Sequence, residues 1–121
     1  MTKTKINFNS KLKSISDYWS PKVIAELNDY QFKLAKIKGE FIWHEHSDTD
    51  EAFVVIKGDI EIELEDSTIK LSEGEMFVVP KGAKHKPVAK GEAHIMLIEP
   101  KGVKNTGDIE NELTAKNDIW I

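Results

Sequence analysis

Short runs of alternating apolar and polar residues, separated by turn residues, occupy most of this 121-residue chain. The sequence IEIEL, residues 60–64, is the clearest of these runs. Successive side chains of an extended strand point to opposite faces, so such a run favours a strand with one buried face and one exposed face. Turn residues recur about every 8–12 residues, which is the strand spacing of all-β sandwiches and barrels. The pattern therefore predicts an all-β fold.

The alternation also predicts where the individual elements lie. We expect strands at residues 22–27, 30–37, 41–46, 53–56, 60–64, 69–71, 76–79, 85–88 and 93–98. The first two flank Asn28-Asp29 and read as a hairpin. Within 41–46, period 2 predicts that Phe41 and Trp43 face away from Ile42, His44 and His46.

The length fits one domain with one modest core. We expect an N-terminal segment at 1–20, a β-domain at 21–100 and a C-terminal strap at 101–121. A short helix is predicted over 9–16, where Leu12 and Ile15 have helical spacing. The strap is polar but ends in Ile-Trp-Ile, an apolar end that we expect to dock on another surface.

Charge and composition exclude several classes of protein. The formal net charge is −4 and no basic patch is visible, which argues against nucleic-acid binding. All 17 basic residues are lysine, so the chain offers no guanidinium fork for a carboxylate or phosphate. There is no cysteine, no signal-peptide pattern and no apolar run near the ~20 residues of a membrane span. We expect a cytoplasmic protein without membrane contact.

The stretch HEHSDTDE, residues 44–51, concentrates metal-binding side chains. On a strand His44 and His46 project from one face, ~7 Å apart. Glu51 can return to that face after a polar loop, and His85 opens another strand after a Pro-x-Gly turn. Imidazoles with a carboxylate suit iron, manganese, nickel, cobalt, copper or zinc. The alternative is that these histidines only form hydrogen bonds and that the acidic residues belong to a solvated loop.

Two longer segments resemble the paired motifs of the cupin family. The first is GEFIWHEHSDTDEAFVVIKG at 39–58, with the glycines, both histidines and the glutamate in register. The second is GEMFVVPKGAKHKPVA at 74–89, with its glycine, Pro-x-Gly and histidine in register. The gap from Gly39 to His44 is one residue shorter than usual, and Ala89 replaces the asparagine that closes the second motif. Neither departure affects the metal-ligand positions of the motifs.

The resemblance is to small single-domain members of the RmlC-like cupin superfamily. It implies a double-stranded β-helix, also called a jelly-roll barrel, which is often dimeric. It also implies one divalent transition metal per chain, held by His44, His46, Glu51 and His85. Strand parity then predicts the lining of the pocket beside the metal: Ile42, Phe53, Val55 and Ile60, with His94 as a further candidate.

The cupin fold hosts many activities, so the function stays open at this point. The first hypothesis is a metal-dependent enzyme, an oxidoreductase such as a dioxygenase or an isomerase, acting on a small oxygen-rich molecule. The alternatives are a non-catalytic small-molecule-binding or sensing protein, a structural or scavenging metalloprotein, and a sugar-phosphate-isomerase-like protein. The lack of arginine disfavours the last. A homodimer is also expected, because Phe41, Trp43 and the residues at 119–121 have no assigned place inside the barrel.

Overall fold

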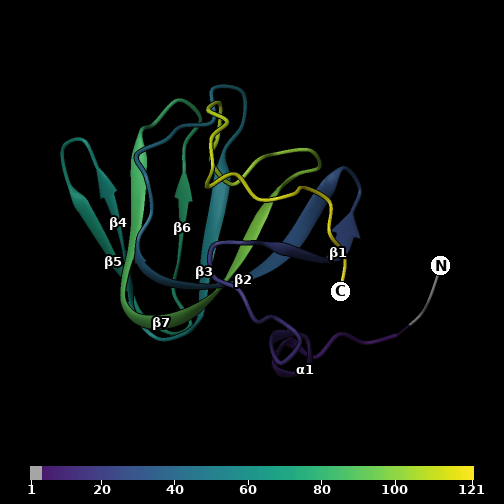
Figure 1. The fold of residues 1–121 in the computed structure, drawn as a ribbon. Helices are drawn as coiled ribbons and strands as arrows, with labels where there is room; N and C mark the ends of the chain where they lie inside the picture. The colour runs from purple at the N-terminus through teal and green to yellow at the C-terminus, as the bar shows by residue number, and fades with distance from the viewer. Residues whose placement is uncertain (1–3) are drawn as a thin grey trace.

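The computed structural model describes residues 4–121 of the chain. These residues contain seven strands and one short helix. The sheet order is β1-β2-β7-β3-β6, with β4 pairing both β5 and β7, and the strand pairs are antiparallel. The all-β prediction with a short N-terminal helix is confirmed (Figure 1). The elements are α1 Phe8–Leu12, β1 Lys22–Leu27, β2 Tyr30–Glu40, β3 Glu51–Lys57, β4 Ile60–Leu64, β5 Thr68–Leu71, β6 Met76–Val79 and β7 His85–Pro100.

Strand β7 joins the two halves of the barrel. Its first part pairs with β4 and with the end of β2, and its second part pairs with β2 and β3. The sequence suggested two separate strands here, at 85–88 and 93–98. They form one strand because the chain bends between them without leaving the sheet, as the long curve of β7 in Figure 1 shows. A register shift between Ile37 and Gly39 lets β2 follow the same bend.

The hydrophobic core lies between the two halves. Strands β2 to β7 each direct alternate side chains into it, as period 2 requires. Burying each such aliphatic side chain favours folding by about 1.5–3 kcal/mol relative to exposure. The buried members of the core are Ala35, Ile37, Phe53, Val55, Ile60, Ile62, Leu71, Val79, Ala89, Ala93, Ile95 and Leu97.

Residues 41–46 do not form the predicted strand. Their one bridge in the described structure joins His44 to His85 through two backbone hydrogen bonds of 3.0 and 2.9 Å. Phe41 is buried whereas Trp43 is 43% exposed, so the prediction that these two share a face is wrong. Gly39, with a φ of +84°, directs the chain away from regular strand geometry at this point. The resulting loop points its histidines inward.

Helix α1 is shorter than predicted. Asn7 caps its start by accepting a hydrogen bond from Ser10 N at 2.9 Å. After Leu12 the chain turns, and the Ser14 hydroxyl donates to Lys11 O, so it competes with a continued helix. Leu12 and Ile15 are buried nonetheless, in a small cluster on the outer face of the sheet. Among residues 4–121, no helix has the length and apolar character needed to cross a bilayer.

The C-terminal strap, residues 101–121, runs from the end of β7 back to β1 and is yellow in Figure 1. Its end docks beside β1, where Val23 N donates to Ile119 O at 2.7 Å and Ile121 N donates to Val23 O at 3.1 Å. Midway along the strap, Asp108 N donates to Glu45 O at 3.0 Å. The strap therefore contacts the loop that carries the first two histidines.

Candidate metal centre

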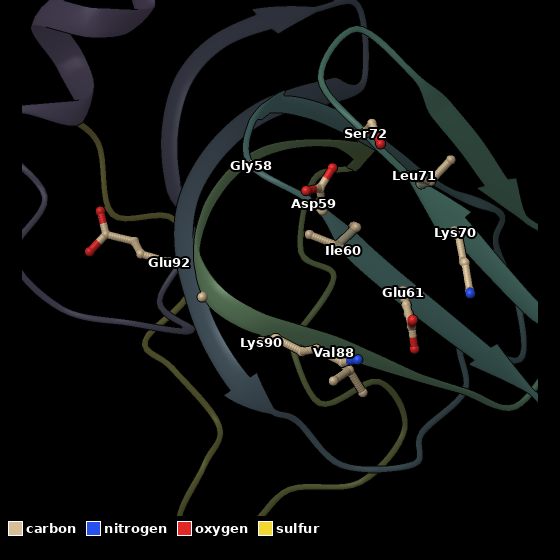
Figure 2. A pocket seen from close by; sticks show the side chains of 11 residues that line it. Gly58, Asp59, Ile60, Glu61, Lys70, Leu71, Ser72, Val88, Lys90 and Glu92 are labelled. Atoms are coloured by element: carbon tan, nitrogen blue, oxygen red, sulfur yellow. The ribbon is translucent and has the colours of Figure 1, made fainter.

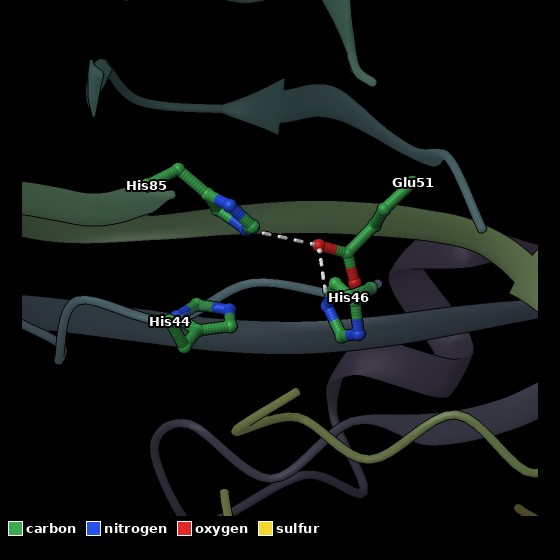
Figure 3. Close-up of side chains that lie close together, drawn as sticks. All are labelled: His44, His46, Glu51 and His85. Atoms are coloured by element: carbon green, nitrogen blue, oxygen red, sulfur yellow. Dashed lines mark ion pairs between the residues drawn. The ribbon is translucent and has the colours of Figure 1, made fainter. Parts of the chain in front are cut away.

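Four predicted ligands come together at one end of the barrel (Figure 3). His44 and His46 lie on the irregular loop, Glu51 opens β3 and His85 opens β7. Their candidate donor atoms all lie within 4.8 Å of one another, and each residue is at most 5% exposed. Gly82 of the Pro-x-Gly turn donates its N–H to His46 O at 2.8 Å, so the second motif supports the first.

The centre contains buried polar atoms that lack hydrogen bonds. Glu51 Oε1 lies 3.3 Å from His46 Nε2 and 3.4 Å from His85 Nε2 (Figure 3). None of these three atoms has a hydrogen-bond partner. A buried polar atom without a partner is costly, and such atoms are rare in folded proteins. Three that converge on one point, two from imidazoles and one from a carboxylate, fit a bound transition-metal cation.

Backbone carbonyls orient two of the imidazole rings. His44 Nδ1 lies 2.9 Å from Ile42 O, and His85 Nδ1 lies 2.9 Å from Ala83 O. Because a carbonyl oxygen only accepts, Nδ1 carries the proton in both rings and Nε2 keeps its lone pair. Histidines that bind metals are commonly held in this way by their second nitrogen.

The surroundings shift the pKa values of these groups in different directions. Burial lowers the pKa of His44 from its ordinary 6.5 to about 4, and the nearby His85 ring adds to this effect. Burial also disfavours charged His46, but the Glu51 carboxylate outweighs burial and raises the pKa of His46. Burial favours protonated Glu51, yet contacts with Glu99 and His46 hold the pKa of Glu51 well below its usual range.

Glu99 of β7 is a neighbour that the sequence did not single out. Burial and the adjacent Glu51 carboxylate raise the pKa of Glu99 well above its usual range. Glu99 therefore holds a proton more readily than Glu51 does. No motif marks Glu99, because it lies beyond both cupin motifs and resembles any other glutamate near a strand end.

A cavity of about 30 Å³ lies beside His44 and Glu51, inside the barrel. Trp19 closes it and stacks on Phe41, with ring centroids 4.8 Å apart and planes 15° apart. Trp19 is held in place because its backbone N–H and its Nε1–H donate to backbone carbonyls of β2, each at 2.9 Å. Asn105 of the strap also lines the cavity and donates to Trp19 O at 3.0 Å. Neither Trp19 nor Asn105 belongs to a motif that could have revealed this role.

Among the predicted pocket residues, Phe53 lines this cavity and the others do not. Ile42 is half-buried, and its carbonyl faces the His44 ring. Val55 is buried in the core, and His94 Nε2 contacts the Glu92 carboxylate at 2.7 Å on the outer side. Strand parity misplaced Ile42 because residues 41–46 are not a strand.

Ile60 lines a different hollow, of about 460 Å³, between β4, β5 and the bend of β7 (Figure 2). The labelled side chains around it are mostly charged and of both signs, and no member of the metal centre lines it. A further hollow of about 560 Å³ lies between His46 and the strap, with Lys101, Lys104 and Asp108 on its wall. The metal centre therefore lies between a small internal cavity and an open hollow under the strap.

The sequence profile of the cupin domain family, Cupin_2, matches residues 32–101, which is more than half of the chain and includes all four candidate ligands. The chain belongs to the cupin family. The buried group of three histidines and a glutamate is thus a candidate metal site in a cupin fold.

Three similar proteins support the family, and their names state no activity. A cupin-2 domain containing protein from Shewanella frigidimarina is 58% identical, covering 79% of this chain and 94% of its own, with a TM-score of 0.78. The protein NMB1881 from Neisseria meningitidis is 33% identical, covering 81% and 100%, with a TM-score of 0.74. The uncharacterised protein YdbB of Bacillus subtilis is 39% identical over 64 residues. These aligned residues make up 52% of this cupin and span 57% of the length of YdbB.

Proposed function

We propose that this cupin binds one divalent transition metal through His44, His46, Glu51 and His85 and is a metal-dependent enzyme acting on a small oxygen-rich molecule. The observation that carries the proposal is the convergence of three buried atoms that lack hydrogen bonds. Iron, manganese, nickel, cobalt, copper and zinc all suit this donor set. When bound, such an ion supplies Lewis acidity toward a carbonyl or hydroxyl oxygen.

The protein groups around the site would orient the ligands and exclude water. The carbonyls of Ile42 and Ala83 hold two rings with their Nε2 atoms toward the centre. Phe41, Phe53 and Trp19 form an apolar wall on the cavity side. Electrostatic interactions are stronger in such a water-excluded site than in bulk water.

We propose a small, neutral or singly anionic chelating substrate, such as a hydroxy-ketone, an enediol or a small carboxylate. The internal cavity holds about one water molecule, so a larger molecule must approach through the hollow beside His46 or displace Trp19. Lysines on that hollow offer point charges, but the chain has no arginine to grip a phosphate. Sugar phosphates are therefore expected to bind weakly.

Elemental analysis of protein purified without a tag or added metal tests the metal site. Wild-type protein should carry about one transition-metal ion per chain, and His46→Ala should lose most of it. His94→Ala is the matched control, because His94 contacts Glu92 on the outer side of the barrel and should keep full occupancy. Unchanged stoichiometry and affinity in His46→Ala would contradict the ligand set.

The second candidate is a binding or sensing protein without turnover, and the small size of the cavity favours it. Calorimetry on the metal-loaded protein should compare a small hydroxy-ketone with mannose 6-phosphate, together with an assay for product. Product formation supports the enzyme, whereas tight binding without product supports the sensor. Micromolar binding of the sugar phosphate that persists after metal removal would instead favour the isomerase-like alternative.

We also propose a homodimer, formed through the outer face of β6, β3 and β7. Of the residues that first suggested a dimer, Phe41 and Ile121 contact their own chain, whereas Trp43 and Trp120 are 43% and 49% exposed. The outer sheet patch is apolar across three strands, and its two members on edge strand β6 are 53% and 47% exposed. Edge strands are normally protected by charges, so a second copy of this face is a suitable cover. The patch comprises Ala52, Val54, Met76, Val78 and Ile98, and Met96 at its border packs against the cluster of Leu12 and Ile15.

A further inference from the structure

A row of polar side chains crosses the barrel interior beside the metal centre. The strand register pairs Gln31 with Glu99 and Ala52 with Ile98, which puts Glu51 next to Glu99 across the β3–β7 ladder. Gln31, Glu99 and Glu51 are at most 3% exposed. Apart from Glu51, the proposed function gives these residues no role.

Lys33 of β2 contacts one oxygen of the Glu99 carboxyl group. Lys33 Nζ lies 2.7 Å from Glu99 Oε2, and the two side chains are 4% and 2% exposed. Lys33 Nζ also donates to Val103 O of the strap at 3.2 Å. The other Glu99 oxygen, Oε1, receives no bond from any N–H or hydroxyl group in the described structure, which leaves it available to the Glu51 carboxyl group.

Stability alone does not account for this buried pair. Burying a lysine and a glutamate is costly, and replacing such a buried pair by apolar residues of similar size is often neutral or stabilising. The pair lies next to a candidate ligand, and contacts to a ligand from outside the coordination sphere strongly affect metal affinity.

We propose that Glu99 is a positioning residue of the metal centre: anchored by Lys33, it contacts the Glu51 carboxyl group from behind and fixes it toward the histidines. Through Val103 the same lysine links the strap to this contact. The inference rests on the proposed metal-binding function and extends it to two residues outside both cupin motifs.

The decisive variant is the double substitution Lys33→Met with Glu99→Leu, which removes both polar groups while keeping a similar volume. Its metal-free form should be as stable as wild type or more so, because neither Lys33 nor Glu99 is left buried without the other. Its dissociation constant for Zn²⁺ or Co²⁺ should nevertheless rise about 10–100-fold, the usual effect of losing an outer contact to a ligand. A purely structural role predicts the opposite pattern, with stability changed and metal affinity kept.

Glu99→Gln supplies the conservative comparison, since its amide can accept from Lys33 and donate to Glu51 at once. It should bind metal within about threefold of wild type and give the same Co²⁺ absorption spectrum. Glu40→Leu is the matched control, because Glu40 makes an ion pair of the same 2.7 Å length with Lys86 but is exposed and outside the metal centre.

The outcomes distinguish a failure of the positioning role of Glu99 from a failure of the metal site itself. Unchanged metal affinity in the double variant overturns the positioning role and leaves the metal site intact. Affinity in Glu99→Gln as weak as in the double variant also overturns it, because the amide preserves both contacts. A wild-type protein that binds neither Zn²⁺ nor Co²⁺ overturns the proposed function and this inference together.

Discussion

Individual residues of the centre have different proton affinities because their immediate contacts differ. His44 lies against Phe41 and His85, away from any close carboxylate contact, and its pKa falls to about 4. His46 lies 3.3 Å from Glu51, and its pKa rises. Two histidines only two residues apart in sequence therefore have pKa values shifted in opposite directions.

The contribution of His44 to the stability of the metal-free protein should fall as the pH drops from about 6.5 to about 4. Over this range an unfolded His44 takes up a proton and the folded one does not, since its pKa is lowered from 6.5 to about 4. Protons therefore favour the unfolded state, by up to about 3 kcal/mol. Urea unfolding in EDTA at a series of pH values measures this, and His44→Asn should flatten the decline. Parallel curves for the two proteins would show that another group is responsible.

At the scale of elements, the strap makes one especially close backbone contact, at Gly107. Gly107 has a φ of +69°, and a Cβ added there would collide with the Glu45 carbonyl. Gly102 has a φ of +93°, but a Cβ there meets open space. Alanine substitutions at the two glycines therefore distinguish the energetic cost of a positive φ from the cost of a steric clash.

Gly107→Ala should destabilise the protein by about 2–5 kcal/mol, the sum of a φ penalty and a forced shift of the strap. Gly102→Ala should cost only about 1–2 kcal/mol, because it carries the φ penalty alone. Urea unfolding gives both values, and limited proteolysis should cut the strap faster in Gly107→Ala. Equal costs for the two variants would mean that the strap does not press on Glu45 in solution.

Regular elements were predictable from sequence where the alternation was strict. Strand 60–64 and the hairpin around Asn28-Asp29 are observed as predicted, because one face of each is buried. Residues 41–46 also alternate, yet their path depends on the φ of Gly39 and on the bridge to His85, which is remote in sequence. The four candidate ligands could be named from spacing, whereas Trp19 and Glu99 reach the site only through tertiary contacts.

For the whole molecule, the outer sheet patch leads to a test of assembly. Sedimentation at micromolar concentration should give twice the 13.7 kDa mass of one chain. Val78→Glu should shift it to a monomer by placing a charge in the apolar interface. Leu113→Glu, which alters a 46% exposed residue of the strap, should leave the dimer intact. A single 13.7 kDa species for the wild type would count decisively against the dimer.

The central position of β7 also sets the order in which the molecule can be assembled. β7 supplies the partner for β2, β3 and β4, with pairs as remote as Tyr30 and Pro100. During synthesis β2, β3 and β4 leave the ribosome before β7, so the edges that pair with β7 stay unpaired until β7 has been made. Folds dominated by such remote pairings typically fold in milliseconds to seconds. His85 opens this late strand, so a growing chain has no complete set of ligands to capture a metal until the barrel itself can close.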